Sequence, residues 1–542
     1  MTELPFAITL QGGSSLANKT GMWRQERPVY VERRPPCNEQ CPAGQDIQRW
    51  LYHAESGDYE TAWRVIMQDN PLPAVVGRVC YHPCTAACNR GQLDEAVGIN
   101  SVERFLGDEA IKRSWAPDGR AEPSGKRVLV VGAGPCGLSA AYQLARLGHE
   151  VVLRDAARRP GGMLRFGIPA YRLPREVLDA EVARILAMGV ELESNSQVSD
   201  ILAAMREGAF DAALMAVGAH VAQRAYIPAG DAAHIIDAVS LLHRIEDGEP
   251  PSLGRHVAVY GGGDTAMDAA RSARRLGASE AMVVYRRNRE RMPAHDIEVQ
   301  EALEEGIVVK WLSTVKAARH GRLVLERMEL DEDGSVRPTG RLEELDADSL
   351  VLALGQQADL SLLDGVPGLV VKDGVLSVDE HMMSGYPGIF AGGDMVPAER
   401  SVTVAVGHGK RAARHIDAWL AGSPAPLESA REAVGFDQLN TWYYSDAPRS
   451  VAARLDAVRR CSTFEEVQVG LDEQNALFEA RRCLSCGNCF ECDNCYGLCP
   501  DNAVIKLGAG LRYEIDYDYC KGCGICVQEC PCGAIEMQPE PL

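Results

Sequence analysis

The sequence has no long hydrophobic run, no excess of basic residues and no low-complexity segment. Nowhere do eighteen apolar residues follow one another, so we expect no transmembrane helix. The first residues, MTELPFAITLQGGSS, lack a basic start followed by a long apolar stretch, so we expect no secretory signal. The formal net charge of −20 argues against nucleic acids and anionic membranes as partners.

Cysteine, in contrast, is abundant. Eighteen cysteines in a chain without an expected export signal indicate metal ligation in a reducing compartment, and therefore a cytoplasmic protein, more than a disulfide framework. The 542 residues are too many for one hydrophobic core, so we expect three or four domains.

Two motifs near the C-terminus carry the most specific signal. The chain reads CFECDNCYGLCP from Cys489 and CKGCGICVQECP from Cys520, and each is the C-x2-C-x2-C-x3-C-P run of a ferredoxin with two [4Fe–4S] clusters. In such ferredoxins the fourth cysteine of each run ligates the other cluster. The expected ligand sets are Cys489, Cys492, Cys495 and Cys530 for one cluster, and Cys520, Cys523, Cys526 and Cys499 for the other. Two complete copies make a structural zinc site a weak alternative.

A dinucleotide-binding fingerprint lies at 127–155, RVLVVGAGPCGLSAAYQLARLGHEVVLRD. The pattern predicts a strand at 127–131, a turn through Gly132, Gly134 and Gly137, a helix, and a second strand that ends at Asp155. The glycines allow the turn, the approach of a pyrophosphate and close packing of helix on strand, while the acid can bind a ribose hydroxyl.

A second fingerprint, the GxGxxA variant, follows at Gly261, Gly263 and Ala266. The next predicted strand, 281–285, ends in Tyr285-Arg286-Arg287 instead of an acid. A guanidinium there can bind the 2′-phosphate of NADP(H), and Arg286 is the better candidate, with Arg287 beside it. Two exposed arginines without a ligand are the alternative.

Segments 388–394 (GIFAGGD) and 401–414 (SVTVAVGHGKRAAR) predict a short strand and a helix. In flavoproteins with two dinucleotide sites, such a segment returns to the first domain and contacts the flavin. The stretches at 214–219 and 352–356 are typical of the crossings between two such domains. Two nucleotide sites suggest FAD at one and a nicotinamide nucleotide at the other.

The N-terminal part holds a third group of cysteines, namely Cys37, Cys41, Cys80, Cys84 and Cys88. The text between them, IQRWLYHAESGDYETAWRVIMQDN, has apolar residues at helical spacing. We expect a small helical iron–sulfur domain, with zinc as the alternative that the spacing alone leaves open.

Further motifs between residues 35 and 435 belong together: CPAGQDI, DNPLPAVVGRVC, INSVERF, VVGAGPCGLSAAYQLARLGHEV, GGMLRFGIPAYRLP, GGGDTAMDAAR, VYRRNRERMPA and IFAGGD. Over this range the chain resembles the small subunit of glutamate synthase, NADPH-linked electron-transfer flavoproteins and the N-terminal half of dihydropyrimidine dehydrogenase. With its attached ferredoxin motifs it is similar to the flavoprotein of reverse dissimilatory sulfite reductase. It is also similar to the flavin subunit of some 2-oxoacid:ferredoxin oxidoreductases.

The resemblance implies FAD at the first site and NAD(P)H, with NADPH favoured, at the second. Hydride would pass from nicotinamide to flavin and electrons would leave singly into the clusters, so no acid–base catalytic residues are expected. The remaining candidate dinucleotide contacts are Gly162, Asp264, Gly393, Asp394 and Thr403. Cys136 has no partner cysteine nearby in the sequence, which argues against a disulfide-reductase mechanism.

The resemblance also implies two N-terminal clusters. One would use Cys41, Cys80 and Cys84, with Glu103 as an oxygen ligand; an exposed helix charge is the alternative for Glu103.

The other N-terminal cluster lacks its usual pair of cysteines, since none precedes Cys37. The matching phrase occurs instead at 471–487, LDEQNALFEARRCLSCG. Our hypothesis is that Cys483 and Cys486 complete a cluster with Cys37 and Cys88, either within one chain or across a dimer. That would make four clusters per chain. The alternative is that both cysteines are unliganded.

The expected fold is a multidomain α/β protein with two Rossmann-like domains between an N-terminal helical iron–sulfur domain and a C-terminal ferredoxin-type α+β domain. The expected boundaries are 1–115 for the helical domain, 120–250 and 346–435 for the FAD domain, 251–345 for the NAD(P) domain, 436–482 for a connector and 483–542 for the ferredoxin domain.

The expected function is electron transfer between NAD(P)H and a ferredoxin-type acceptor. The chain would serve as a subunit of a 2-oxoacid:ferredoxin oxidoreductase or sulfite reductase complex, in a homodimer or hetero-oligomer. The alternatives are a free-standing NAD(P)H:ferredoxin oxidoreductase, a glutamate synthase small subunit and a non-enzymatic iron–sulfur scaffold.

Overall fold

The computed structural model describes residues 19–223, 234–319, 321–423 and 431–541. The N-terminal stretch 1–15, in which we expected no secretory signal, lies outside these ranges. None of the helices in the described ranges has the length and apolarity needed to cross a membrane.

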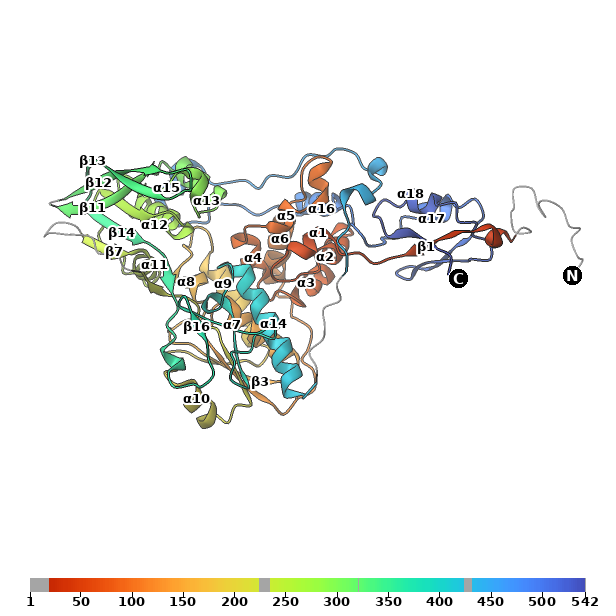
Figure 1. Cartoon of the computed structure of the whole chain (residues 1–542), viewed down its shortest axis with the longest axis horizontal. Coiled ribbons are helices and arrows are strands. Elements are labelled where there is room, and N and C mark those ends of the chain that lie inside the picture. Colours follow the sequence, from red (N-terminus) through yellow and green to blue (C-terminus); the bar gives the residue numbers. More distant parts are fainter. Residues whose placement is uncertain (1–18, 224–233, 320, 424–430, 542) are drawn as a thin grey trace, which may run out of the picture.

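A helical unit lies at the centre of the molecule in Figure 1. Its helices are α1 (Pro36–Gln40), α2 (Ile47–Glu55), α3 (Tyr59–Met67), α4 (Pro73–Val79), α5 (Pro83–Ala86) and α6 (Ile99–Lys112). The predicted helical periodicity is confirmed in α2, which buries Ile47, Trp50, Leu51 and Ala54. Helices α4 and α6 pack with their backbones in close contact at Gly77. A Cβ there would lie only 2.5 Å from the Arg104 nitrogen, so the contact requires glycine.

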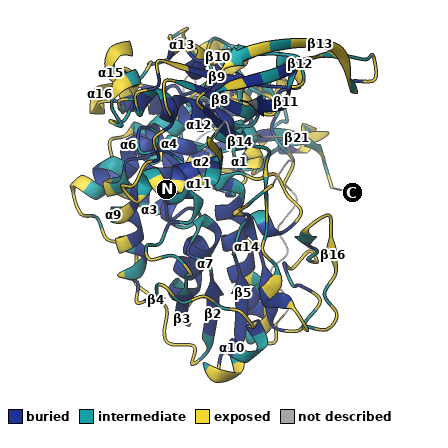
Figure 2. Cartoon of the chain, turned by 90° about the vertical axis from the view of Figure 1, so that its left-hand side faces the viewer, coloured by how far each residue is buried: buried dark blue, intermediate teal, exposed yellow. Residues whose placement is uncertain are grey.

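The first α/β unit has a five-stranded parallel sheet. Its strand order is β18 (Ile389–Ala391), β5 (Ala212–Met215), β2 (Arg127–Val131), β3 (Glu150–Arg154) and β4 (Glu191–Glu193). Helices α7 (Pro135–Arg146) and α14 (Val402–Leu420) pack against each other, and Figure 2 shows them and the sheet as largely buried. The predicted strand at 127–131, its helix and the returning segment after residue 388 are confirmed.

The second α/β unit has another five-stranded parallel sheet, with helix α12 (Asp264–Arg275) next to it. The strand order is β10 (Val308–Lys310), β9 (Glu280–Val284), β8 (His256–Gly261), β14 (Ser349–Ala353) and β7 (His234–Asp237). A three-stranded antiparallel sheet adds β11 (Ser313–Arg319), β12 (Arg322–Leu330) and β13 (Val336–Asp346). Just beyond the first predicted crossing and at the end of the second, β6 (Val221–Ala222) pairs with β15 (Gln356–Gln357), so the two connecting segments lie side by side there.

The C-terminal unit projects from the helical unit at the right of Figure 1. It contains α17 (Asn494–Gly497), α18 (Ile525–Gln528), the hairpin β19 (Val504–Gly508) and β20 (Arg512–Ile515), and β21 (Ile535–Pro539). Strand β21 pairs antiparallel with β1 (Glu26–Tyr30), which comes from the other end of the chain. The expected multidomain α/β class is thus confirmed, while the pairing of the two chain ends is a feature that no sequence motif indicated.

Candidate functional site

The first glycine-rich turn has the geometry that a dinucleotide requires. Gly132 has φ +103°, and a Cβ on Gly137 would lie 1.8 Å from the Gly132 oxygen, so α7 can sit on β2 only with glycine here. At Gly134 a Cβ would meet nothing closer than Gly162 Cα, 4.0 Å away. The turn is therefore open in front of the first turn of α7, where free N–H groups favour a pyrophosphate.

Polar residues around this turn are held in place from several elements. Asp155 follows β3 and accepts hydrogen bonds from the Ala133 nitrogen at 2.6 Å and the Ala157 nitrogen at 2.7 Å, which locks its carboxylate beside the turn. The Gly393 nitrogen donates to His408 Nδ1 at 3.1 Å, and burial raises the pKa of Asp394. The open turn, the helix start and the locked acid fit FAD, which the sequence predicted at this site.

The second turn repeats this arrangement with different partners. Gly261 has φ +154° and a Cβ on Gly263 would meet nothing within 4 Å, so this turn is also open to a ligand. Asp264, the first residue of α12, accepts from the His295 backbone nitrogen at 2.9 Å and pairs with its Nδ1 at 2.8 Å. Ala266, in the first turn of α12, is fully buried. These features fit the nicotinamide nucleotide.

Arg286 and Arg287 follow β9 at the edge of this turn. Arg286 is exposed and Arg287 is half-buried, and neither guanidinium has an ion-pair partner within the described ranges. Tyr285 packs its ring against Gly262, where a Cβ would lie 2.3 Å from Cδ2, and so fixes the start of this segment. Both guanidinium groups are therefore free to meet a phosphate.

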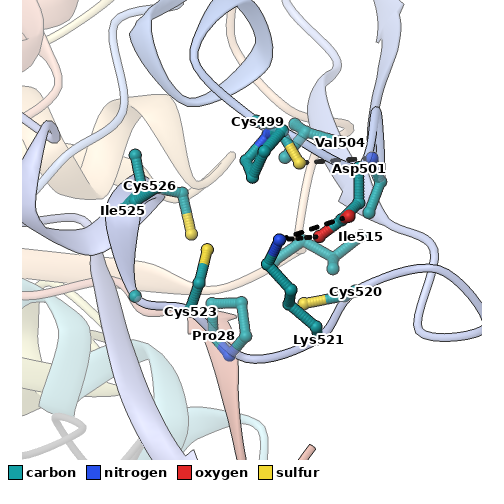
Figure 3. A pocket seen from close by; sticks show the side chains of 13 residues that line it. Pro28, Cys499, Asp501, Val504, Ile515, Cys520, Lys521, Cys523, Ile525 and Cys526 are labelled. Atoms are coloured by element: carbon teal, nitrogen blue, oxygen red, sulfur yellow. Dashed lines mark hydrogen bonds and ion pairs between the residues drawn. The ribbon is translucent and has the colours of Figure 1, made fainter. Parts of the chain in front are cut away.

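The C-terminal unit brings the predicted second ligand set together. Cys499, Cys520, Cys523 and Cys526 line one pocket, and Figure 3 shows their sulfurs around its space. Cys499 comes from the first motif and the other three come from the second, as the crossed ferredoxin arrangement requires. Pro28 of β1 closes one wall.

The cysteines of the first predicted ferredoxin ligand set also lie close together. Burial, together with the nearby thiols of Cys489, Cys492 and Cys530, raises the pKa of Cys495 to about 11. Sequence reasoning missed Cys532, which is buried with its sulfur 3.7 Å from Cys530 Sγ. It lies two residues beyond a motif cysteine but outside the motif itself, so the pattern carried no signal for it.

The third group joins cysteines from both ends of the chain. Burial raises the pKa of Cys37 well above its usual range, and the neighbouring thiols of Cys483, Cys88 and Cys486 add to this effect. Asn89 Nδ2 lies 3.7 Å from Cys486 Sγ. The structure thus brings Cys37, Cys88, Cys483 and Cys486 together within one chain.

The segment that carries Cys483 is held against the helical unit by buried charges. Helix α16 (Glu473–Arg481) presents Glu479, which accepts from the Gly98 nitrogen at 2.7 Å. Arg482 is 2% exposed and lies 3.1 Å from Glu479 and 3.2 Å from Asp94. Asp94 in turn accepts hydrogen bonds from Nε and Nη2 of Arg90, at 2.8 and 2.7 Å. This network fixes residues 479–483 in position.

The fourth group contains Cys41, Cys80, Cys84 and Glu103. Burial, followed by the charges of Cys41, Cys80 and Glu103, raises the pKa of Cys84 above its usual range. Glu103 is 5% exposed, so it is not the exposed helix charge that the sequence left open. Its Oε1 accepts from Gln45 Nε2 at 2.7 Å and Asn70 Nδ2 at 2.9 Å.

This fourth group adjoins the first nucleotide site. Burial raises the pKa of Cys80, and the nearby hydroxyl of Thr403, at the start of α14, partly offsets the increase. A Cβ on Gly407 of α14 would lie 2.0 Å from the Pro42 oxygen, so the helix touches the loop after Cys41.

No three His, Cys, Asp or Glu side chains of the described ranges lie close enough together to hold a single metal ion. The four cysteines in Figure 3 surround a space instead, and soft thiolate donors around a space fit an iron–sulfur cluster.

Comparison with known proteins agrees with this geometry. The family model described as pyridine nucleotide-disulphide oxidoreductase matches residues 126–409, which is more than half of the chain. The chain belongs to this family. The model of dihydropyrimidine dehydrogenase domain II with its 4Fe-4S cluster matches residues 19–115, and that of a 4Fe-4S binding domain matches residues 513–536.

Three relatives narrow the family to glutamate synthase small subunit-like oxidoreductases. The chain is 39% identical to the NADP(+)-dependent formate dehydrogenase subunit beta of Moorella thermoacetica, over 83% of this chain and 70% of that protein. It is 31% identical to the NADPH-Fe(3+) oxidoreductase subunit beta of Geobacter sulfurreducens (87% and 78%). It is 32% identical to the glutamate synthase [NADPH] small chain of Escherichia coli (71% and 89%).

The oxidoreductase is therefore an NAD(P)H-dependent electron-transfer protein that uses FAD and [4Fe–4S] clusters. This excludes the non-enzymatic scaffold that the sequence left open. Three cysteines, Cys136, Cys461 and Cys532, stand outside the four groups.

Proposed function

We propose that this chain is the electron-transfer subunit of a larger redox enzyme and exchanges electrons between NADPH and a catalytic subunit on another chain. The observation that carries the proposal is the succession of cysteine groups. The group with Cys80 adjoins α14, because Cys80 lies near Thr403. The group with Cys37 lies next to it, since Cys37 is close to Cys84. The Gly487 nitrogen, next to Cys486, then donates to the Cys532 oxygen at 2.6 Å in the projecting unit.

The residues that would hold each group follow from the site. FAD would lie on Gly132, Gly134, Gly137, Asp155, Gly162, Gly393, Asp394 and Thr403. NADPH would lie on Gly261, Gly263, Asp264, Ala266, Arg286 and Arg287. When bound, the flavin converts two-electron exchange with the nicotinamide into one-electron exchange with iron–sulfur clusters. The protein contributes binding, orientation and exclusion of water.

We further propose four [4Fe–4S] clusters, one at each cysteine group, with the domain boundaries given above. The two ferredoxin clusters use the crossed ligand sets. The clusters nearer to the flavin use Cys37, Cys88, Cys483 and Cys486, and Cys41, Cys80, Cys84 and Glu103. Apart from the exposed Cys492 and Cys523, every cysteine of these groups is buried or half-buried. This supports the assignment, because the shell around a metal site controls its access to solvent.

The catalytic partner is the finer part of the proposal. A formate dehydrogenase catalytic subunit is supported by the relative from Moorella, while the motifs support a 2-oxoacid:ferredoxin oxidoreductase or a sulfite reductase. Anaerobic purification of the tagged full chain from its native host, with identification of co-purifying chains, tests this. The complex should reduce NADP+ with one of formate, a 2-oxoacid or sulfide. If the chain purifies alone and reduces ferredoxin rapidly, it is a free-standing NAD(P)H:ferredoxin oxidoreductase instead.

The preference for NADPH has its own test. Arg286→Ala should raise the KM for NADPH relative to NADH by about ten-fold or more, because one guanidinium–phosphate contact is worth roughly 1.5–3 kcal/mol. Arg341→Ala, at an exposed position on β13, is the control and should change neither constant. An unchanged KM ratio for Arg286→Ala would remove the phosphate-binding role.

A further inference from the structure

Strand β1 completes the projecting ferredoxin unit from the opposite end of the chain. Its five residues pair with β21, from Glu26 opposite Pro539 to Tyr30 opposite Ile535. Arg24 before the strand binds Glu540 with two contacts of 2.6 Å, and Arg33 after it donates to the Gly533 oxygen at 2.7 Å. The strand is therefore anchored at both ends and its register is fixed.

This register places one side chain of β1 against a cysteine sulfur. The Tyr30 hydroxyl lies 3.2 Å from Cys495 Sγ. The ring stacks on Tyr513, with centroids 6.4 Å apart and planes inclined by 18°. Pairing with β21 holds the backbone of Tyr30 and the stack limits its ring, so the hydroxyl has a defined position next to the sulfur.

We propose that Tyr30 is a positioning residue that donates a hydrogen bond to the Cys495 thiolate and so raises the reduction potential of the cluster held by Cys489, Cys492, Cys495 and Cys530. A cluster-bound thiolate carries no proton, so the tyrosine must be the donor in this pair. A donor stabilises the extra negative charge of the reduced cluster, which makes reduction easier. The inference rests on the proposed ligand role of Cys495.

The consequence is a link between the two ends of the chain. The segment around β1 contributes no ligand, yet it sets a property of a cluster whose ligands all lie beyond residue 488. Because this cluster follows the Cys483–Cys486 group in the chain, its potential governs how readily electrons pass between the body of the protein and the projecting unit.

The test is an anaerobic redox titration of the full holoprotein, followed by EPR, for Tyr30→Phe. This variant keeps the ring that stacks on Tyr513 and removes only the hydroxyl. The matched control is Tyr517→Phe, since the Tyr517 hydroxyl donates to the Pro28 oxygen of the same strand at 2.9 Å and makes no hydrogen bond to a sulfur within the described residues. We expect Tyr30→Phe to shift one cluster to a more negative potential and the control to shift none.

Two results would overturn the proposal: unchanged potentials in Tyr30→Phe, or the same shift in both variants, which would mean that the strand acts only through packing. The iron content of Cys495→Ser distinguishes a wrong role for Tyr30 from a wrong ligand assignment for Cys495. If Cys495→Ser retains all the iron and all the EPR signals of the parent, Cys495 is not a ligand and the underlying assignment is wrong. If iron is lost there but Tyr30→Phe has parental potentials, only the role of Tyr30 is wrong.

Discussion

The C-terminal ferredoxin unit and the central helical unit both gather cysteines, but over very different lengths of chain. The eight proposed ferredoxin ligands all lie between Cys489 and Cys530, in two motifs of fixed spacing. One group in the helical unit instead joins Cys37 and Cys88 to Cys483 and Cys486, which lie 395 or more residues further on. Short spacing restricts where a thiol can go, whereas long spacing leaves the partner to the fold.

The two regions also exchange parts. The helical unit receives Cys483 and Cys486 from the C-terminal side, and the ferredoxin unit receives β1 from the N-terminal side. Closing such long loops costs conformational entropy, so each borrowed segment needs strong local contacts to offset it. Buried arginines supply them: Arg482 holds the first segment and Arg24 the second.

The largest expected effect is on the group that spans the chain. Cys483→Ser should lower the iron content by about four per chain, because a [4Fe–4S] cluster needs its full thiolate set, and should remove one EPR signal. Iron analysis and EPR of the anaerobically purified protein measure this. Cys461→Ser is the control, since Cys461 lies near the Glu305 carbonyl and outside all four groups. Parental iron in Cys483→Ser would show that the gathered thiols hold no cluster.

The second prediction tests how far the ferredoxin unit depends on β1 for its stability. Gly522 has φ +75°, and a Cβ there would lie 2.2 Å from the Glu26 oxygen of β1. Gly510 has φ +78° with nothing within 4 Å. Both alanine variants carry about 1–2 kcal/mol of backbone strain, but Gly522→Ala must also push β1 away. We expect a Tm several degrees lower than in Gly510→Ala.

A faster loss of cluster absorbance in air should accompany the lower Tm of Gly522→Ala, because displacing β1 opens the wall made by Pro28. Equal stability and equal bleaching rates in the two variants would mean that the ferredoxin unit does not depend on β1.

The smallest expected effect concerns the Asp94 network that holds residues 479–483 against the helical unit. Asp94→Asn removes the charge that Arg90 and Arg482 share, which should cost about 2–3 kcal/mol of unfolding free energy. Hydrogen bonding from Arg90 holds the pKa of Asp94 below its usual value of 3.8. A lowered pKa contributes stability above that value, and the contribution is lost as the pH falls below about 4.

Denaturant unfolding at neutral and acidic pH measures this effect. The asparagine variant should lose less stability on acidification than the parent. Asp118→Asn, which breaks an exposed pair with Arg64, should cost at most about 1 kcal/mol. If the two variants are equally stable, the Asp94 network does not hold the segment.

The glycine-rich turns and the ferredoxin motifs were predictable because their function depends on local geometry. The strand before Gly132, the helix after it and the acid at position 155 all lie within thirty residues, and each appears where the pattern indicated. The strand before Arg286 begins and ends one residue earlier than the predicted 281–285, at Glu280–Val284. Such a shift leaves both arginines just beyond the strand end, so the prediction about their position survives it.

Long-range partners were not predictable in the same way. Nothing in the phrase ERPVY marks it as a strand of the ferredoxin unit, and nothing marks Tyr30 as the neighbour of Cys495. Glu103 could equally have been an exposed helix charge, since its burial depends on tertiary packing that brings Gln45 and Asn70 to its carboxylate. The phrase at 471–487 suggested that Cys483 and Cys486 complete an N-terminal cluster, but it left open whether the same chain or a second subunit supplies them.

The sequence by itself determined the cofactor classes and the two Rossmann-like folds, because short-range patterns of glycine, cysteine and apolar residues fix turns, thiol spacing and strand–helix alternation. Only the tertiary structure decided which chain end completes which unit, because contacts between segments hundreds of residues apart depend on surface fit and buried charge, which leave no periodic trace along the chain.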